Sequence, residues 1–148
     1  MNNERLAANY TRVFEHAAAA AERAGRLPGS WRLVAVTKTV SPSVAAALFG
    51  IGARDFGENR VQTLLEKIDA LADKKIRWHL IGHLQTNKVR KVVGAVSLIH
   101  SVDSVRLAVE IDTVAAEKGI AQDVLLEVNV SSEESKFGLP PAQAPSVA

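Results

Sequence analysis

A single lysine ends the most strand-like apolar segment of this sequence. Arg32-Leu-Val-Ala-Val-Thr-Lys38 is an apolar run that stops at Lys38, and Thr39-Val-Ser-Pro42 then reads as a loop that opens a helix. In parallel α/β folds the carboxyl ends of the strands surround the active site, so a lysine at such an end is presented to a ligand. A partly desolvated amine captures aldehydes as Schiff bases. We therefore expect Lys38 to bind a carbonyl compound, and the alternative is a solvated lysine that ends a strand.

Further polar residues follow the other predicted strands on the same side of the sheet. Asn59, at the end of Gly57-Glu-Asn59, is placed either to hydrogen-bond a ligand ring or to cap the next helix. Because the carboxyl ends of parallel strands meet at one edge, we expect these polar residues to converge there and form a ligand site. The residues are Lys38, Asn59, His83, Ser101 and Asn129, joined by Lys136 after the polar loop 131–135.

Two other groupings suggest different chemistry. In Trp78-His-Leu-Ile-Gly-His83, strand alternation puts His79 and Ile81 on one face, and His83 joins them only if the strand continues beyond Ile81. A zinc site needs at least three protein ligands, and no third ligand has suitable spacing, so no metal is expected. The basic run 87–91 is expected to be a solvated helical turn rather than a phosphate or nucleic-acid site.

Composition limits the classes of protein that remain. With 148 residues, 47% of them apolar and 23% charged, the chain is expected to form one domain with a real core. A formal charge of +2 is too small to indicate a nucleic-acid-binding face. The absence of cysteine excludes disulfides and thiolate metal sites. No apolar run approaches the roughly 20 residues that span a bilayer, and the N-terminus lacks a signal-peptide layout, so a cytoplasmic protein without membrane contact is expected.

Helical and strand-like patterns alternate along the chain. An amphipathic helix is predicted over 2–26. A second helix is predicted over 60–72, with Asn59 as its N-cap and Gln62 bonding back to Asn59 as in a capping box. Lys67 is expected at the surface of that helix. Strands are predicted over 31–36, 53–56, 76–81, 96–100 and 123–130, and further helices over 43–49, 88–93 and from Asp103 to Gly119.

The last of these helices and the segment that ends the chain carry their own predictions. Asp103 is expected to cap the helix, and Val105, Val109, Ile111 and Val114 to pack inward. The prolines of 140–145 allow no more than one helical turn.

The strands recur at intervals of roughly 20 to 25 residues, which is typical of right-handed βα units and a parallel sheet. Neither a Gly-x-Gly-x-x-Gly turn nor a Walker-type loop follows a strand, so dinucleotide and P-loop folds lack their phosphate-binding turn. The fold class expected is therefore α/β, with a parallel (β/α) barrel in a single domain of residues 1–148. Its parts are a helix over 1–26, βα units over 31–139 and the start of another element over 140–148.

Five motifs in order carry a family resemblance. They are Ala35-Val-Thr-Lys38, Phe56-Gly-Glu-Asn59, Trp78-His-Leu-Ile-Gly-His-Leu-Gln-Thr-Asn-Lys88, His100-Ser-Val-Asp103, and Asn129 with Glu134-Ser-Lys-Phe-Gly138. From about residue 32 to 139 the sequence resembles the pyridoxal phosphate homeostasis protein family. The resemblance implies the barrel of the alanine racemase N-terminal domain and a role in vitamin B6 and amino-acid homeostasis. It also implies pyridoxal 5'-phosphate held as a Schiff base on Lys38 beside Asn59, without turnover.

The sequence departs from that family at its end. The family continues past Gly138 with strands, a serine- and glycine-rich loop and an Arg-Ile-Gly segment that hold the phosphate, and these are missing here. We therefore expect an incomplete barrel of about five strands, with the cofactor weakly bound or absent. Open sheet edges are expected to cause self-association. The alternatives are a pyridoxal phosphate-dependent racemase-like enzyme, whose second acid/base would need another domain, and an interaction fragment without cofactor.

Overall fold

The computed structural model describes residues 3–131, 133 and 137–147, which form one curved sheet with helices between its strands. The strands are β1 (Val34–Val36), β2 (Asp55–Glu58), β3 (Arg77–Leu80), β4 (Leu98–Val102) and β5 (Val124–Leu126). The helices are α1 (Asn3–Arg23), α2 (Pro42–Gly50), α3 (Val61–Ala70), α4 (Val89–Val92) after a 3-10 turn η1 (Thr86–Lys88), α5 (Val105–Lys118) and α6 (Ala144–Val147).

All four strand pairings are parallel, and the strands lie in the sheet in the order of the sequence, β1-β2-β3-β4-β5. A doubly wound sheet would reverse its strand order at a switch point, whereas a barrel adds each strand beside the previous one. The expected barrel-type parallel sheet is therefore confirmed, with β1 and β5 as its two edges among the described residues.

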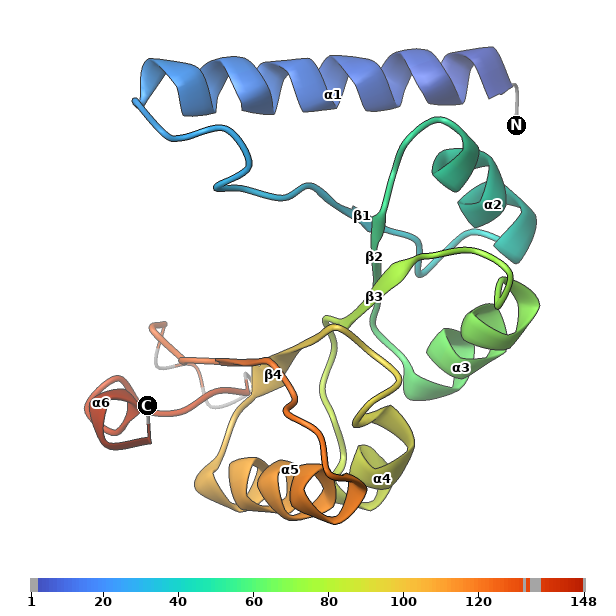
Figure 1. Ribbon diagram of the computed structural model, residues 1–148. Coiled ribbons are helices and arrows are strands. Elements are labelled where there is room, and N and C mark those ends of the chain that lie inside the picture. Colours follow the sequence, from blue (N-terminus) through green and yellow to red (C-terminus); the bar gives the residue numbers. More distant parts are fainter. Residues whose placement is uncertain (1–2, 132, 134–136, 148) are drawn as a thin grey trace.

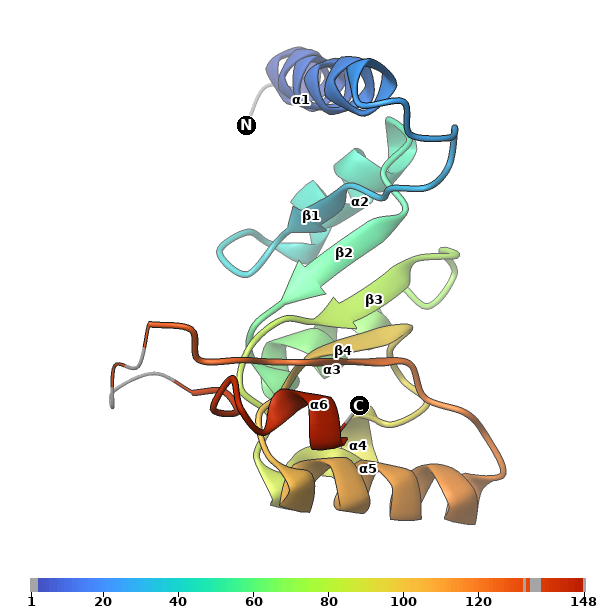
Figure 2. The same cartoon turned by 90° about the vertical axis from the view of Figure 1, so that its left-hand side faces the viewer.

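The helices that connect the strands lie on one face of the sheet. Figure 1 shows α2, α3, α4 and α5 following the outer, convex side of the sheet, while α6 lies on the opposite side. Figure 2 looks onto that opposite, inner face, where β1 to β4 run side by side, an extended orange segment crosses in front of β4, and α6 lies below β4 in the view. Right-handed crossovers account for this arrangement, because each one returns its helix to the same side.

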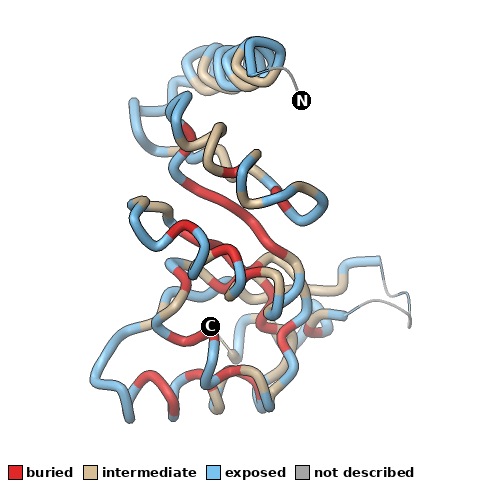
Figure 3. Tube along the Cα trace, turned by 90° about the vertical axis from the view of Figure 1, so that its right-hand side faces the viewer, coloured by how far each residue is buried: buried red, intermediate tan, exposed pale blue. Residues whose placement is uncertain are grey.

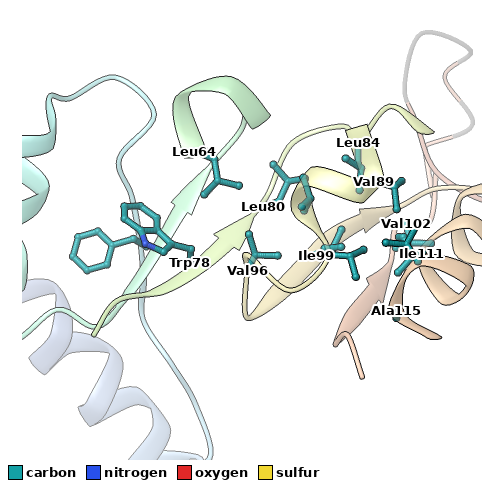
Figure 4. Packing of buried hydrophobic residues seen from close by; sticks show 14 of the residues in the cluster. Leu64, Trp78, Leu80, Leu84, Val89, Val96, Ile99, Val102, Ile111 and Ala115 are labelled. Atoms are coloured by element: carbon teal, nitrogen blue, oxygen red, sulfur yellow. The ribbon is translucent and has the colours of Figure 1, made fainter. Parts of the chain in front are cut away.

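The hydrophobic core fills the layer between the sheet and the outer helices. Phe56 and Trp78 from neighbouring strands contact each other there, with ring centroids 5.7 Å apart. Figure 4 shows further buried side chains from β3, β4, α3 and α5 meeting in this layer, among them Leu64, Leu80 and Ile99, which are completely buried. All four residues of β2 are buried (Figure 3), so β2 is a central strand of the fold.

Helix α1 packs loosely beside the edge strand β1. No residue of α1 is fully buried, and its Tyr10 and Phe14 rings continue an aromatic row to Trp31. Val13, which shares the apolar spacing of the predicted helix, is half exposed. The helix itself is confirmed over most of its predicted length.

The predicted position of β2 is wrong by two residues. The strand runs over Asp55–Glu58 rather than 53–56, so Gly57 and Glu58 belong to the sheet and not to a turn. Glu58 is compatible with a buried strand because its carboxylate is paired with Lys67. The predicted β4 is likewise shifted by two residues, and the edge strands β1 and β5 are shorter than predicted because each has one neighbour only.

Two predicted helix caps are also wrong. Helix α3 has Arg60 at its N-cap, and the Arg60 side chain makes no capping hydrogen bond. The Gln62 side chain donates to Glu66 instead of bonding back to Asn59. Helix α5 begins after Ser104, whose hydroxyl accepts from the Leu107 amide, whereas Asp103 binds His83.

The inward face of α5 differs from the prediction as well. Val105 and Val109 are exposed, while Leu107, Ile111 and Val114 are buried. The prediction is therefore confirmed for Ile111 and Val114 and wrong for Val105 and Val109, because Leu107, Ile111 and Val114 follow one another at the spacing of three and four residues that defines one helix face.

Candidate cofactor site

Lys38 lies in a tight turn directly beyond β1. The Val40 amide donates to the Thr37 carbonyl at 3.0 Å, which closes the turn and places Lys38 at its first central position. The Lys38 side chain is exposed, and it has no hydrogen-bond partner within the described part of the chain. The amine is therefore accessible at the carboxyl end of its strand, where the sequence predicted it.

Asn59 lies at the matching position beyond the neighbouring strand. Val36 pairs with Gly57, and the Thr37 amide donates to the Gly57 carbonyl at 3.0 Å, so the register carries on toward Lys38 and Asn59. The Asn59 side chain is half buried and, like Lys38, has no hydrogen-bond partner among the residues described. An unengaged amine and an unengaged amide thus lie on neighbouring strand ends.

A close backbone approach holds Asn59 in place. A Cβ atom built on Gly82, in the loop after β3, would lie 2.2 Å from the Asn59 carbonyl oxygen and 2.8 Å from its Cα. Only glycine allows this contact, which brings the loops after β2 and β3 together at the carboxyl edge.

A buried ion pair that the sequence did not predict lies under the Lys38 turn. Lys67 was expected at the surface, but it is only 2% exposed, and its Nζ lies 2.6 Å from the Glu58 carboxylate. Lys67 also donates to the Thr37 carbonyl at 2.6 Å, and the Thr37 hydroxyl donates to Glu58 at 2.6 Å. Helical spacing contains the signal: Lys67 comes three residues after the buried Leu64, on the face that meets the sheet.

A second polar cluster lies on the other face of the sheet, because Asp55 comes three residues before Glu58 on β2 and side chains alternate along a strand. Arg77 binds the Asp55 carboxylate through two hydrogen bonds of 2.8 and 2.6 Å. His79 contacts Asp55 through Nε2 at 3.1 Å and His100 through Nδ1 at 2.9 Å. The sequence pattern indicated His79 only as a possible metal ligand and does not contain this cluster, because its members come from three strands.

The electrostatics of this cluster follow from its contacts. Burial alone would raise the pKa of Asp55, but hydrogen bonds from Arg77 and His79 outweigh it and leave the pKa below its ordinary value. Burial, and then the neighbouring His79, lower the pKa of His100. Asp55 is therefore an anion and His100 a neutral imidazole at neutral pH.

His83 and Ser101 lie at the predicted edge but are engaged with other protein groups. The His83 Nδ1 is 3.0 Å from the Asp103 carboxylate, and its ring stacks on Phe137 with centroids 4.1 Å apart. The Ser101 hydroxyl donates to the Gly82 carbonyl at 2.6 Å. Both residues therefore connect the loops around the site to one another.

Asn129 belongs to a loop that folds back on itself. Its amide side chain donates to the Glu133 carbonyl and accepts from the Ser131 hydroxyl. Its backbone amide donates to the Leu139 carbonyl, beside a parallel bridge between Val128 and Leu139. The prediction for Lys136 concerns a residue that lies outside the described part of the chain.

A large cavity lies away from these residues. It has a volume of about 660 Å³ and is lined by residues of α1 and by residues near the starts of β1, β2 and β3, such as Leu33, Arg54 and Arg77. Lys38 and Asn59 lie at the opposite ends of the strands. Residues 3–131, 133 and 137–147 contain no group of three or more side chains that could hold a metal ion, and no helix among them is long and apolar enough to cross a membrane.

Comparison with known proteins relates this site to a family. Residues 2–148 match the family "Alanine racemase, N-terminal domain". The pyridoxal phosphate homeostasis protein of Aquifex aeolicus is 48% identical over 131 residues, which cover 88% of this chain and 58% of that protein. The chain therefore spans less than two thirds of the length of this relative.

Solved structures give the same relationship. PipY of Synechococcus elongatus, solved with pyridoxal phosphate bound, is 37% identical, with a TM-score of 0.73 over 86% of this chain and 61% of that one. Alanine racemase from Bartonella henselae, with covalently bound pyridoxal phosphate, is 15% identical and shares the fold, with a TM-score of 0.73 over 99% of this chain and 38% of that one. The resemblance drawn from the motifs is confirmed: the chain belongs to the family of the alanine racemase N-terminal domain.

Proposed function

We propose that this protein binds pyridoxal 5'-phosphate through Lys38 and acts in vitamin B6 and amino-acid homeostasis. The observation that carries the proposal is the unengaged Lys38 amine beside the unengaged Asn59 amide, at adjoining strand ends. The names of the Aquifex relative and of the PipY structure support the choice of ligand.

The residues at this edge fit the reactive end of the cofactor. When bound, pyridoxal phosphate supplies an aldehyde, which condenses with an amine and releases one water. Lys38 would provide that amine, and Asn59 would hydrogen-bond an oxygen on the pyridine ring. His83, Ser101 and Asn129 would form the outer part of the site.

The phosphate end fits less well. The carboxyl edge of the described chain offers no serine- and glycine-rich loop to surround a phosphate. Charge-assisted hydrogen bonds to such a group are each worth about 1.5 to 3 kcal/mol, so we expect weak and reversible binding. A pyridoxal phosphate titration that saturates below micromolar concentration would contradict this expectation.

Absorbance tests the attachment directly. Pyridoxal phosphate added to the protein is expected to produce a visible band, and borohydride is expected to fix the label on the peptide that contains Lys38. Lys38→Ala should abolish both signals, while Lys75→Met, which removes an exposed lysine, should preserve them. A band that survives in Lys38→Ala would overturn the assignment. Racemisation of alanine that depends on Lys38 would instead show an enzyme.

The two sheet edges support a proposal about association. Val36 on β1 is 54% exposed and Leu125 on β5 is 48% exposed, next to backbone groups that have no neighbouring strand among the described residues. Burying a few hundred Å² of apolar surface at roughly 25 cal/mol per Å² is worth several kcal/mol before association costs. The chain is therefore expected to self-associate in a cytoplasmic setting, and light scattering that shows a monodisperse monomer would refute this.

A further inference from the structure

We propose that Lys67 is a positioning residue for Lys38: its buried ammonium holds the turn that presents the reactive amine. The inference rests on the proposed function of Lys38, but the contact itself is independent of any ligand. Lys67 donates to the Thr37 carbonyl, so it acts on Lys38 through the backbone of Thr37.

The Thr37 carbonyl is the point where the two parts meet. It accepts one hydrogen bond from the Val40 amide at 3.0 Å, which defines the Lys38 turn, and one at 2.6 Å from Nζ of Lys67, in the last turn of α3. The remaining groups of Thr37 are fixed as well, because its amide donates to Gly57 and its hydroxyl donates to Glu58. The residue before Lys38 is thus bound at three atoms.

Burial makes this arrangement specific. The side chains of Lys67 and Glu58 are 3% and 0% exposed. Removing two charges from water costs free energy, which only good ion-pair geometry and further hydrogen bonds offset. An apolar pair of similar volume would fill the same space at no greater cost in stability. The Glu58 Oε2 is buried and has no hydrogen-bond partner in the described structure, so the pair is not optimised for stability alone. What the ion pair adds is a donor aimed at the Thr37 carbonyl.

The ion pair also couples the turn to the rest of the fold. Glu58 is the last residue of β2, directly before Asn59, and Lys67 lies on α3, so one pair of charges fixes the ends of β1 and β2 relative to a helix. Lys38 and Asn59, the two unengaged side chains, therefore keep a constant separation without touching each other. Such preorganisation favours a ligand that must meet both groups at once.

A paired substitution tests the role without leaving an isolated buried charge. Lys67→Met with Glu58→Gln removes both charges at nearly constant volume, so the fold should persist while the donor to Thr37 is lost. The matched control is Lys75→Met, which removes a lysine that is exposed. The two readouts are hydrogen exchange of the Val40 amide without any ligand and titration with pyridoxal phosphate followed by visible absorbance.

The expected result is a change at the turn with little change in thermal unfolding. Loss of one charge-assisted hydrogen bond should speed Val40 exchange and weaken pyridoxal phosphate binding, each by roughly tenfold to a hundredfold. Unchanged exchange and affinity in a folded double variant would refute the positioning role.

The remaining outcomes separate this inference from the proposed function. If wild-type protein carries no label on Lys38, the proposed function fails, yet the Val40 exchange still tests the turn. If the double variant does not fold, the wild type alone decides: its Val40 amide should exchange as slowly as amides in the middle of α3. Exchange that is a hundredfold faster than in α3 would show that Lys67 does not hold the turn.

Discussion

Replacing Gly82 by alanine should destabilise the protein and displace Asn59. The added Cβ would lie 2.2 Å from the Asn59 carbonyl oxygen, whereas ordinary contact begins near 3.4 Å, so the two loops must separate by about 1 Å. The obstacle is backbone, which cannot swing aside as a flexible side chain can. Overpacking of this kind costs typically about 1–3 kcal/mol, and we expect a value in the upper half of that range because the clash involves three backbone atoms.

Urea denaturation of Gly82→Ala measures this cost. The matched control is Gly50→Ala, because a Cβ at Gly50 meets nothing within 4 Å and the residue ends helix α2, where alanine is the better helix former. The control should be as stable as the wild type or more stable. A Gly82→Ala protein that unfolds at the wild-type urea concentration would refute the close approach, and with it the account of how Asn59 is held. Pyridoxal phosphate titration of the same variant should show weaker binding.

Three further predictions concern the inner face and the edge. Arg77→Met should lower the free energy of unfolding by about 1–2 kcal/mol at neutral pH, a modest loss because the Arg77 side chain is half exposed and solvent screens its pair with Asp55. Since the pKa of Asp55 is lowered in the folded protein, this difference should shrink as pH falls below 3.8. A pH-independent difference in urea unfolding would contradict this prediction. Burial, and then His79, lower the pKa of His100, so its imidazole should titrate below 6.5 by NMR and stability should fall as pH drops below that value. Titration at or above 6.5 would refute the burial of His100 beside His79. Val36→Lys should make the protein monomeric in light scattering, since a charge blocks an exposed edge, and unchanged association would exclude β1 as the interface.

The sequence predicted the elements that depend on local patterns. Alternating apolar runs and the glycines and prolines between them gave five strands and their helices, and the missing phosphate-binding turns pointed to a barrel-type order. Lys38 was found because a charged residue that ends an apolar run is visible in one dimension. Helix caps were harder, since Asp103 and Ser104 are both good caps and only the contact of Asp103 with His83 separates them.

The features that the sequence did not predict depend on partners far apart along the chain. The carboxylate of Glu58 suggested a turn, because the cation that neutralises it, Lys67, lies nine residues away on the face of α3 that meets the sheet. The cluster of Asp55, His79 and His100 joins three strands in the same way. Burial of charge is decided by such pairs, and a pattern of single residues does not contain them.

The sequential strand order has a consequence for how the chain folds. Each pairing joins residues about 19 to 25 positions apart, as in His79 with Leu98 and Ile99 with Val124, so every strand finds its partner in the unit made just before it. The entropy lost in closing such short loops is small and similar at each step. The sheet can therefore grow by one βα unit at a time while the polypeptide leaves the ribosome, and Lys67 would reach the Lys38 turn as soon as the second unit has been made.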